Sequence, residues 1–544
     1  CKSHQDPGEN HTMLLVDKLP QIACPPGALL EKQPIYSWDL HMLFQDQVTE
    51  RTPEMETNET LRRTMLQEAE SEIRQLLKRV EELNEGDLRR VEQEVLTSMF
   101  ALGRRVLERV IQEQMNTQEV SSRRQGSCGH AQRLVSIRPK HILTLLGPIT
   151  IRRAYYCCLL PDTETKQEQP VDCMRGEAPA DARWGIGKRR TSAGVQEQIS
   201  YLCASLTLEE AAATFSRLYP LQMSARQALF LMQPVGEALA ARDQQQINTI
   251  WEQAAHKHTT PTPSPSQSDL DTSPIERFYI ELDGVFARLR RGSVPMEEHE
   301  HGREGDVYRE IKVGAVFQAK PGRERSELVE GVYVDEPVEA SLHYVAQRTA
   351  LGDFGRHLYA LAVGQGLLRA QQVVVLGDGA PWLWRLVEEH FPNAVQIVDL
   401  YHAKEHVWEV AASVFGRSHP EGVAWAKQAC DWLVHGQIDT LVKAIAALPA
   451  VAPLAGQSKS VPEQAIGYFT SNASRMRYPS FRAQGMQIGS GVAEATCKTV
   501  VSTRAKRAGM RWTPQGLDAL LPLRTSVLNG SFDAFWQGRS HALV

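Results

Sequence analysis

The chain has 544 residues, of which 42% are hydrophobic and 7% aromatic, and its formal net charge is −5. This length predicts about three or four domains. The charge excludes a uniformly basic surface, and because no run of about 18 apolar residues occurs, no membrane-spanning helix is predicted. The nine cysteines are spread too thinly for a disulfide scaffold and are typical of a reducing, cytoplasmic compartment.

The first part of the chain changes from unpatterned to helical sequence. Residues 1–58 begin at Cys1 and carry weak periodicity, so we expect a poorly ordered or non-native extension. Over 59–120, apolar residues such as Leu66, Ile73 and Val80 recur at helical spacing among charged residues. This pattern predicts a helical arm with a break near Gly86, forming a helical hairpin or a dimerisation surface.

A β-hairpin is predicted over 141–156, where leucines and isoleucines flank a turn signal at Gly147-Pro148. Several residues that could bind zinc are close to it in sequence, namely Cys128, His130, Cys157, Cys158 and Cys173. A zinc ribbon requires two CxxC pairs, and this chain has neither. The spacing therefore argues against a zinc ribbon and leaves zinc binding open.

Helical patterns and a linker follow the hairpin. Residues 207–235 predict a helix, a turn and a second helix, with Thr207 and Ser224 as caps. Such a pair could place a helix in the major groove of DNA, although small helical pairs are common. The stretch over 255–274, rich in proline, serine and threonine, predicts a linker and a domain boundary.

Three short acidic motifs, far apart in the chain, are the strongest functional signal. Asp283 follows the strand-like segment 277–282, and Asp378 follows the continuous apolar run 373–376. Glu494 falls in the first turn of a helix-like segment for which Ser490 is a candidate cap. A strand end holds a carboxylate in place and leaves it open to solvent. Three such carboxylates can hold two divalent cations about 3.5–4 Å apart, an arrangement that suits attack on phosphodiesters.

The segments between these motifs predict a mixed five-stranded sheet with helices, an α/β fold. Strands are expected over 277–282, 308–317, 328–334, 373–376 and 395–398, and helical segments near 338–366 and 381–390. Three strands followed by alternating helices and strands are typical of an RNase H-like core, in which the first and fourth strands are neighbours. Asp283 and Asp378 are then expected side by side, which is unfavourable without a cation. We predict two Mg²⁺ ions bound by Asp283, Asp378 and Glu494, with Mn²⁺ as a substitute.

Each acidic motif also has a plain structural interpretation. The Asp-Gly pairs at 283–284 and 378–379 could be ordinary turns at strand ends. Glu494 and Lys498 could form an i,i+4 surface ion pair. The joint pattern favours a metal site over three unrelated features.

Two further groups accompany the acids. Asp399 ends the fifth predicted strand, and His402 follows at a helix start, where it could bind metal or a DNA phosphate or have a structural role. Basic residues follow Glu494 and predict contacts with the DNA backbone, namely Lys498, Arg504, Lys506, Arg507 and Arg511. A merely solvated helix face would show the same pattern.

Five segments, in order along the chain, resemble ISKra-type bacterial insertion-sequence transposases, which are DDE enzymes related to the Mutator-like group. The segments are ELDG, YREIKVGAVF, VVLGDGAPW, VQIVDLYHAKEHVWEVA and IGSGVAEATCKTVV. The resemblance covers 275–530 and extends more loosely to LTLLGPITIRRAYYCC. It implies an RNase H-like catalytic domain that cuts and joins DNA at transposon ends. By resemblance, Asp283, Asp378 and Glu494 form the triad, and Asp399 and His402 form the DxxH element. The sequence departs from the family after RRAYY, where a paired-cysteine knuckle is common and Cys157-Cys158 is followed by Leu-Leu-Pro.

These patterns predict a domain order and an activity. The order is an extension over 1–58, a helical arm over 59–120, a hairpin and helix-turn-helix-like DNA-binding region over 121–254, a linker over 255–274, the first part of the core over 275–402, an all-helical insertion over 403–470, the final core helix with its acid and basic patch over 471–530, and a tail over 531–544. The predicted activity is metal-dependent cleavage and strand transfer at insertion-sequence ends, by a homodimer or higher oligomer associated with the nucleoid. A catalytically silent DNA-binding protein and a structure-specific nuclease stay open as alternatives.

Overall fold

The computed structural model describes most of the chain beyond residue 52. The described residues are 53–83, 87–116, 120–158, 176–186, 190–257, 274–290, 307–539 and 543. They fall into two units, Cys1–Glu68 and Ala69–Val544. The predicted N-terminal extension lies almost entirely outside the described residues, and so does the linker beyond residue 257. No helix in the described ranges is both long and apolar enough to cross a membrane.

The predicted helical arm forms two helices, α1 (Pro53–Glu81) and α2 (Leu88–Asn116). Within the larger unit, the end of α1 is fastened to α2 by polar contacts. Arg79 donates to Glu94 at 3.3 Å and to Ser98 at 2.7 Å, and Arg105 of α2 pairs with Glu72. The structure therefore contains two helices in the predicted region, and side chains at their described residues join them.

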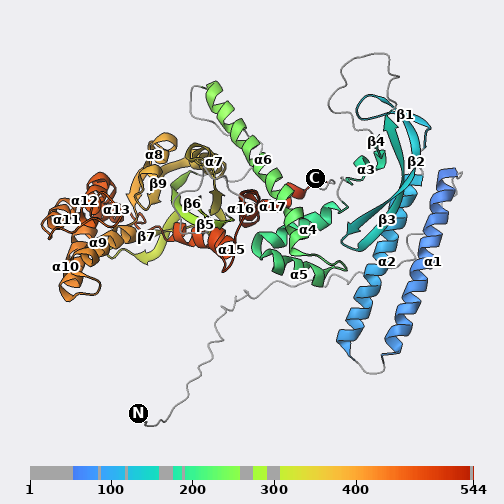
Figure 1. Cartoon of the computed structure of the whole chain (residues 1–544), viewed down its shortest axis with the longest axis horizontal. Helices are drawn as coiled ribbons and strands as arrows, with labels where there is room; N and C mark the ends of the chain where they lie inside the picture. The colour runs from blue at the N-terminus through green and yellow to red at the C-terminus, as the bar shows by residue number, and fades with distance from the viewer. Residues whose placement is uncertain are drawn as a thin grey trace, which may run out of the picture. The chain divides into compact units, whose positions relative to one another are not determined.

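A small antiparallel sheet forms the hairpin module beside α2 (Figure 1). Its elements are β1 (Arg123–Gln125), β2 (Ala131–Thr144), β3 (Gly147–Cys158), β4 (Gly176–Glu177) and the short helix α3 (Pro179–Arg183). The hairpin turns at Leu145-Leu146, two residues before the predicted Gly147-Pro148, because Thr144 already pairs with Gly147. The Thr150 amide donates to Glu108 of α2 at 2.8 Å, which ties the sheet to the helix.

The predicted helix-turn-helix forms part of a larger helical module. This module contains α4 (Ala193–Ser205), α5 (Leu208–Leu218), α6 (Ala225–Lys257), α16 (Pro514–Leu528) and α17 (Phe532–Trp536). Thr207 caps α5 in a capping box with Glu210, as predicted. The second helix is longer than expected, because it continues to Lys257 and crosses α16 so closely that a Cβ at Gly236 would clash with the Ala519 carbonyl. The expected tail is partly helical, since α17 buries its aromatic residues in this module.

The central sheet has mixed strand directions. Its strands are β5 (Ile275–Leu289), β6 (Val307–Arg325), β7 (Tyr333–Pro337), β8 (His343–Gln347), β9 (Ala370–Gly377) and β10 (Val395–Val398). The order is β10-β9-β5-β6-β7, and β8 also pairs with β6. β9 is parallel to β5 and β10, and the other pairs are antiparallel. The expected pairing of the first predicted strand with the fourth is confirmed, but the helix expected from residue 338 is wrong because η3 (Glu339–Ser341) and β8 occupy its first part.

Helices cover both faces of the central sheet. One face packs against α7 (Leu351–Gly364) and α8 (Pro381–His390), since Leu358 approaches Gly314 and Leu383 approaches Gly377. Beyond η4 (Leu367–Arg369) and β10, a series of helical elements follows: α9 (Leu400–Phe415), α10 (Pro420–Val434), α11 (Ile438–Ala446), α12 (Val461–Asn472), η5 (Ala473–Arg475) and α13 (Tyr478–Ala483). The other face carries α14 (Gly491–Thr496), the π-helical turn η6 (Cys497–Ser502) and α15 (Thr503–Ala505).

Candidate active site

Strand register places two of the predicted acids opposite each other. β5 and β9 are parallel, and Glu281 pairs with Leu376. Continuing this register by two residues sets Asp283 of β5 opposite Asp378, which follows β9. Because paired residues of neighbouring strands project to the same face, both carboxylates belong to the face that carries α14. The sequence prediction that these acids lie side by side agrees with this register.

Glu281, two residues before Asp283, fixes the helix that carries the third predicted acid. It lies on the same face of β5, and its side chain is fully buried. Its Oε2 accepts the Ala493 amide of α14 at 2.7 Å. Burial raises the pKa of Glu281 to about 8, although the amides of Ala493 and Val492 oppose this rise. Glu281 was not predicted as a site residue. The pattern that could have indicated it is its spacing of two residues from Asp283, which places both side chains on one face of the strand.

Asp399 makes a second anchor for the same helix. The residue is buried and follows β10, where its amide donates to the Gly377 carbonyl at 2.8 Å. Its carboxylate accepts both the amide and the hydroxyl of Ser490. Ser490 is the N-cap residue of α14, as predicted, but the expected capping bond from its side chain is wrong, because this hydroxyl is directed to Asp399. Glu281 and Asp399 together fix the start of α14 against the strand ends.

His402 forms an ion pair with Asp399. Its Nδ1 lies 3.4 Å from the Asp399 carboxylate, and its backbone amide donates to the same carboxylate at 2.8 Å. The bond to Asp399 raises the pKa of His402 to about 9 against the opposing effect of burial, so the ring is cationic at neutral pH. Burial would raise the pKa of Asp399, but bonds from His402 and Ser490 lower it to about 2. A cationic ring donates from both nitrogens and offers a positive charge to an anion, which is one of the two chemical roles predicted for it.

Asp283 has a polar and partly buried environment. The Gly284 amide donates to its carboxylate at 2.6 Å, and the Cys497 thiol of η6 is a further donor. Burial raises the pKa of Asp283, and the charge of Asp378 raises it further, whereas these two donors and cationic His402 act in the opposite direction. Two carboxylates that repel each other where the pairing of β5 with β9 stops form a site at which a cation would be favourable.

Asp378 is held by the helical insertion. Its Oδ1 accepts the Ala380 amide at 2.9 Å, and Tyr468 of α12 donates its hydroxyl to the Asp378 carbonyl at 2.9 Å. Gly379 has a φ of +94°, and a Cβ there would lie 2.6 Å from the Tyr468 ring. The turn after β9 thus depends on a glycine and on a tyrosine distant in sequence. No local pattern pointed to Tyr468.

Glu494 lies on the helix that crosses this face, but its side chain points to solvent. Ala493 contacts Glu281 and Cys497 contacts Asp283, so Glu494 occupies the turn between these two contacts. Among the described residues, the carboxylates of Asp283, Asp378 and Glu494 do not form a group with all oxygens within 4.8 Å. The alternative interpretation of Glu494 is also not supported, since no ion pair within 4 Å joins it to Lys498, both of them being described.

The predicted basic patch divides into exposed and buried members. Lys498, Lys506 and Arg511 are exposed, and Arg507 is exposed but paired with Glu210 of α5 at 2.7 Å. Arg504 was expected on the surface, and this expectation is wrong. Its side chain is 1% exposed, donates to the Cys203 carbonyl at 2.7 Å and lies over the Trp512 ring. Charge pattern alone did not distinguish this buried cation from its exposed neighbours.

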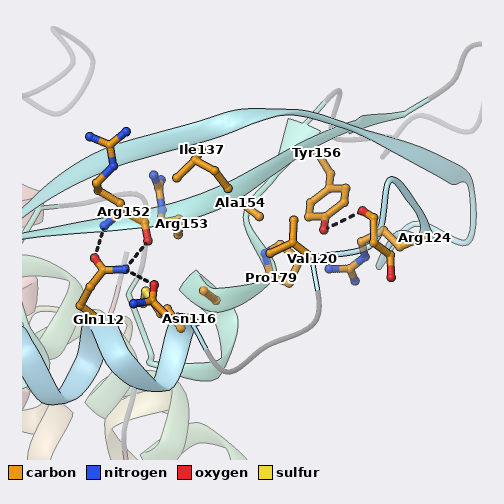
Figure 2. Close-up of a pocket in the computed structure, with 13 residues that line it drawn as sticks. Gln112, Asn116, Val120, Arg124, Ile137, Arg152, Arg153, Ala154, Tyr156 and Pro179 are labelled. Carbon is orange, nitrogen blue, oxygen red and sulfur yellow. Dashed lines mark hydrogen bonds between the residues drawn. The ribbon is translucent and has the colours of Figure 1, made fainter. Parts of the chain in front are cut away.

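A hollow of about 610 Å³ lies in the hairpin module, among residues remote in sequence from the acids (Figure 2). It is lined by β3, by the end of α2 and by Arg124, and Gln112 bonds both the amide and the carbonyl of Arg152. No carboxylate, histidine or cysteine is among the described residues that line it. The hollow therefore offers no ligands for a metal ion and is separate from the candidate active site.

The chain was compared with family models, curated proteins and solved structures. No family model matches the chain, and no curated protein matches it. Among solved structures, the chain is similar to the Drosophila P element transposase strand transfer complex, at 10% identity over 67% of this chain and 84% of that one. The TM-score is 0.22, and at this value the match assigns neither residues nor activity. The fold itself is mixed α/β, with helices on both faces of a mixed sheet.

Proposed function

We propose that this chain is a metal-dependent DNA transposase of the DDE class with an RNase H-like core. One observation carries the proposal: Asp283 lies within β5 just past its pairing with parallel β9, opposite Asp378 at the end of β9, and both acids project to the face that carries the helix with Glu494. The start of that helix is fixed by two buried acids, Glu281 and Asp399. The ISKra-type resemblance falls on the same three acids.

The strand order supports the RNase H-like part of the proposal. Such a core has three antiparallel strands, with the first strand beside a parallel fourth and the fourth beside a parallel fifth. Here β5, β6 and β7 take the first three places and β9 and β10 the last two, with β8 as an addition beside β6. A helix after the last strand, across the carboxylate face, completes the arrangement.

The donor set fits a hard divalent cation. Asp283 and Asp378 offer carboxylate oxygens, the ligand type that Mg²⁺ and Mn²⁺ favour, and the mutual repulsion of the two charges would be relieved by a cation. Asp283 and Asp378 would hold the metal, with Glu494 joining from α14. When bound, the metal would supply charge neutralisation at the phosphate and activation of the attacking hydroxyl.

The chain's own residues would orient and bind the DNA around this point. Glu281 and Asp399 would keep the start of α14 in position beside Asp283, and the exposed Glu494 side chain would turn towards the two aspartates when the metal binds. Cationic His402, close enough to Asp283 to affect its pKa, offers a positive charge to a phosphate. The exposed Lys498, Lys506 and Arg511 would contact the backbone on either side. The DNA-binding role predicted for 121–254 remains part of this proposal.

Cleavage of end DNA is the direct test. The full chain would be incubated with DNA carrying the ends of the element that encodes it, with Mg²⁺ or Mn²⁺, and both cleavage and joining to target DNA would be measured. Asp283→Asn, Asp378→Asn and Glu494→Gln are each expected to abolish cleavage while DNA binding persists. Glu310→Gln is the matched control, because this acid lies on neighbouring β6 and projects to the opposite face.

The outcomes separate the proposal from its alternatives. Binding without cleavage by the wild-type chain would indicate a catalytically silent DNA-binding protein. Cleavage without joining would indicate a nuclease. Retained cleavage in any one of the three variants would remove that residue from the catalytic set.

A further inference from the structure

A second cluster of metal-ligating side chains lies in the hairpin module, in a part of the chain that the proposed catalytic residues do not include. Cys128 and His130 are on the loop between β1 and β2, and Cys158 ends β3. Their ligand atoms all lie within 4.8 Å of one another, and all three residues are partly buried. The sulfur atoms of Cys128 and Cys158 are 3.5 Å apart.

The backbone explains why residues so far apart in sequence meet here. Gln132 pairs with Cys158 across β2 and β3, so the end of β3 lies beside the start of β2. The loop before β2 is tight, since the Gly126 amide donates to the His130 carbonyl at 2.8 Å and Gly129 has a φ of +76°. This loop returns Cys128 and His130 towards Cys158.

The sulfur separation fits zinc better than a disulfide. A disulfide holds its sulfur atoms about 2.05 Å apart. Two thiolates on one tetrahedral Zn²⁺, each at about 2.3 Å, lie roughly 3.8 Å apart. The observed 3.5 Å is close to the second value. Two sulfur ligands and an imidazole also select Zn²⁺ over the hard cations that suit carboxylates.

Neighbouring groups support the ligands. The fully buried Gln132 donates its amide to the Cys158 sulfur at 3.6 Å, a contact that favours the thiolate form. Next to Cys128, the Ser127 amide donates to Glu177 of β4 at 3.1 Å, and the Ser127 hydroxyl donates to the same carboxylate. These contacts fix the loop on two sides before any metal binds.

We propose that Cys128, His130 and Cys158 bind one Zn²⁺ ion, which fastens the loop before β2 to the end of β3. Water or another donor takes the fourth position. The CxxC pairs of a zinc ribbon are unnecessary, because the hairpin supplies the third ligand from a neighbouring strand. Cys173, also considered from the sequence, lies outside the described residues. The site does not depend on the proposed catalytic function.

Metal titration of the full chain tests the site. Protein stripped with a chelator under reducing conditions would be titrated with Zn²⁺ against a chromogenic chelator, and with Co²⁺ to detect thiolate-to-metal absorption, which carboxylates cannot give. The wild-type chain is expected to bind one Zn²⁺ with thiolate ligation. Cys128→Ser and Cys158→Ser are expected to lose both signals, and His130→Asn to weaken binding at least 10-fold.

Cys157→Ser is the matched control, because Cys157 adjoins Cys158 but projects from the other face of β3, and it should keep both signals. Circular dichroism would exclude unfolding of the variants. Within the wild-type chain, removal of Zn²⁺ should increase proteolysis in the hairpin module, a readout that needs no variant. Absence of a thiolate–cobalt signal, or a Cys128–Cys158 disulfide in place of zinc, would overturn the proposal. Retention of the signal in both serine variants would do the same.

Discussion

Two pairs of acids occupy the same face of the central sheet, and they differ in depth. Glu281 and Asp399 are buried, with 0% and 2% of their surfaces exposed, and both bond to the start of α14. Asp283, within β5, and Asp378, just after β9, are only partly buried, and each accepts an amide from a residue one or two positions further on. The first pair holds a helix, and the second pair is available for chemistry.

The comparison shows that position along a strand, more than residue type, separates a structural acid from a candidate catalytic one. Glu281 and Asp283 are two residues apart on one strand face, about 7 Å along β5. Over this distance the side chain changes from fully buried at Glu281 to partly exposed at Asp283. We call Glu281 and Asp399 the deep pair, and Asp283 and Asp378 the outer pair. Removing an acid of the deep pair should therefore affect stability, and removing an acid of the outer pair should affect activity.

The largest expected effect concerns the outer pair. Asp378→Asn should lower DNA cleavage by roughly three orders of magnitude or more, as expected for an essential catalytic group. Its thermal midpoint should be unchanged or higher, because the carboxylate that repels Asp283 is removed. Calorimetry beside the cleavage assay tests both statements. A large loss of stability would place Asp378 with the structural acids instead.

Asp399→Ala should show the opposite pattern, with stability as the main loss. It would leave the buried Ser490 amide and hydroxyl without an acceptor and the partly exposed His402 ring without its ion pair, at a cost of about 1–3 kcal/mol in unfolding free energy. The pKa of His402, raised to about 9 by Asp399, should return towards its ordinary value near 6.5. Urea unfolding and NMR titration of His402 measure the two effects. An unchanged His402 titration would contradict the ion pair.

Much of this arrangement could be predicted from sequence. The strand-like runs before Asp283 and Asp378 carried enough information to predict neighbouring strands, although the first strand does not end at Asp283 as expected but continues to Leu289. The sequence did not reveal which charged side chains are buried. Arg504 belongs to the same basic run as Lys506 but is buried against the Cys203 carbonyl and Trp512. The burial of Arg504 depends on α4, which carries Cys203 and contacts this basic segment only in the folded chain.

Contacts between distant segments were missed for the same reason. Tyr468 reaches the Asp378 carbonyl from the helical insertion. Cys128 reaches Cys158 because a hairpin aligns them, although the spacing matches no zinc ribbon. β8 was expected to be helical, since its five residues alone do not distinguish a strand beside β6 from the helix that follows. Pairing partners, and not local patterns, decide these features.

Glu281→Gln should change how stability depends on pH. Folding raises the pKa of Glu281 from an ordinary 4.5 to about 8, so the folded state holds a proton that the unfolded chain releases. Its contribution is fully present below pH 4.5 and is lost as pH rises towards 8, at up to about 1.4 kcal/mol per pH unit. Glutamine can still accept the Ala493 amide without this loss. Between pH 6 and 8 the variant should therefore gain about 2 kcal/mol relative to the wild type. A constant difference across this range, with Glu310→Gln as control, would contradict a protonated Glu281.

The smallest expected effect concerns Tyr468, the residue of the helical insertion that contacts the backbone of Asp378. Tyr468→Phe removes one hydroxyl that donates to the Asp378 carbonyl at 2.9 Å and keeps the ring that packs beside Gly379. The unfolding free energy should fall by about 1 kcal/mol, the net value of one such bond. Cleavage should fall by less than about 10-fold, because the Asp378 side chain keeps its bond to the Ala380 amide. Urea unfolding and single-turnover cleavage would measure the two changes. A loss of activity as large as that of Asp378→Asn would mean that the tyrosine hydroxyl itself acts in the reaction. The catalytic residues would then include Tyr468 of the helical insertion as well as Asp283 and Asp378.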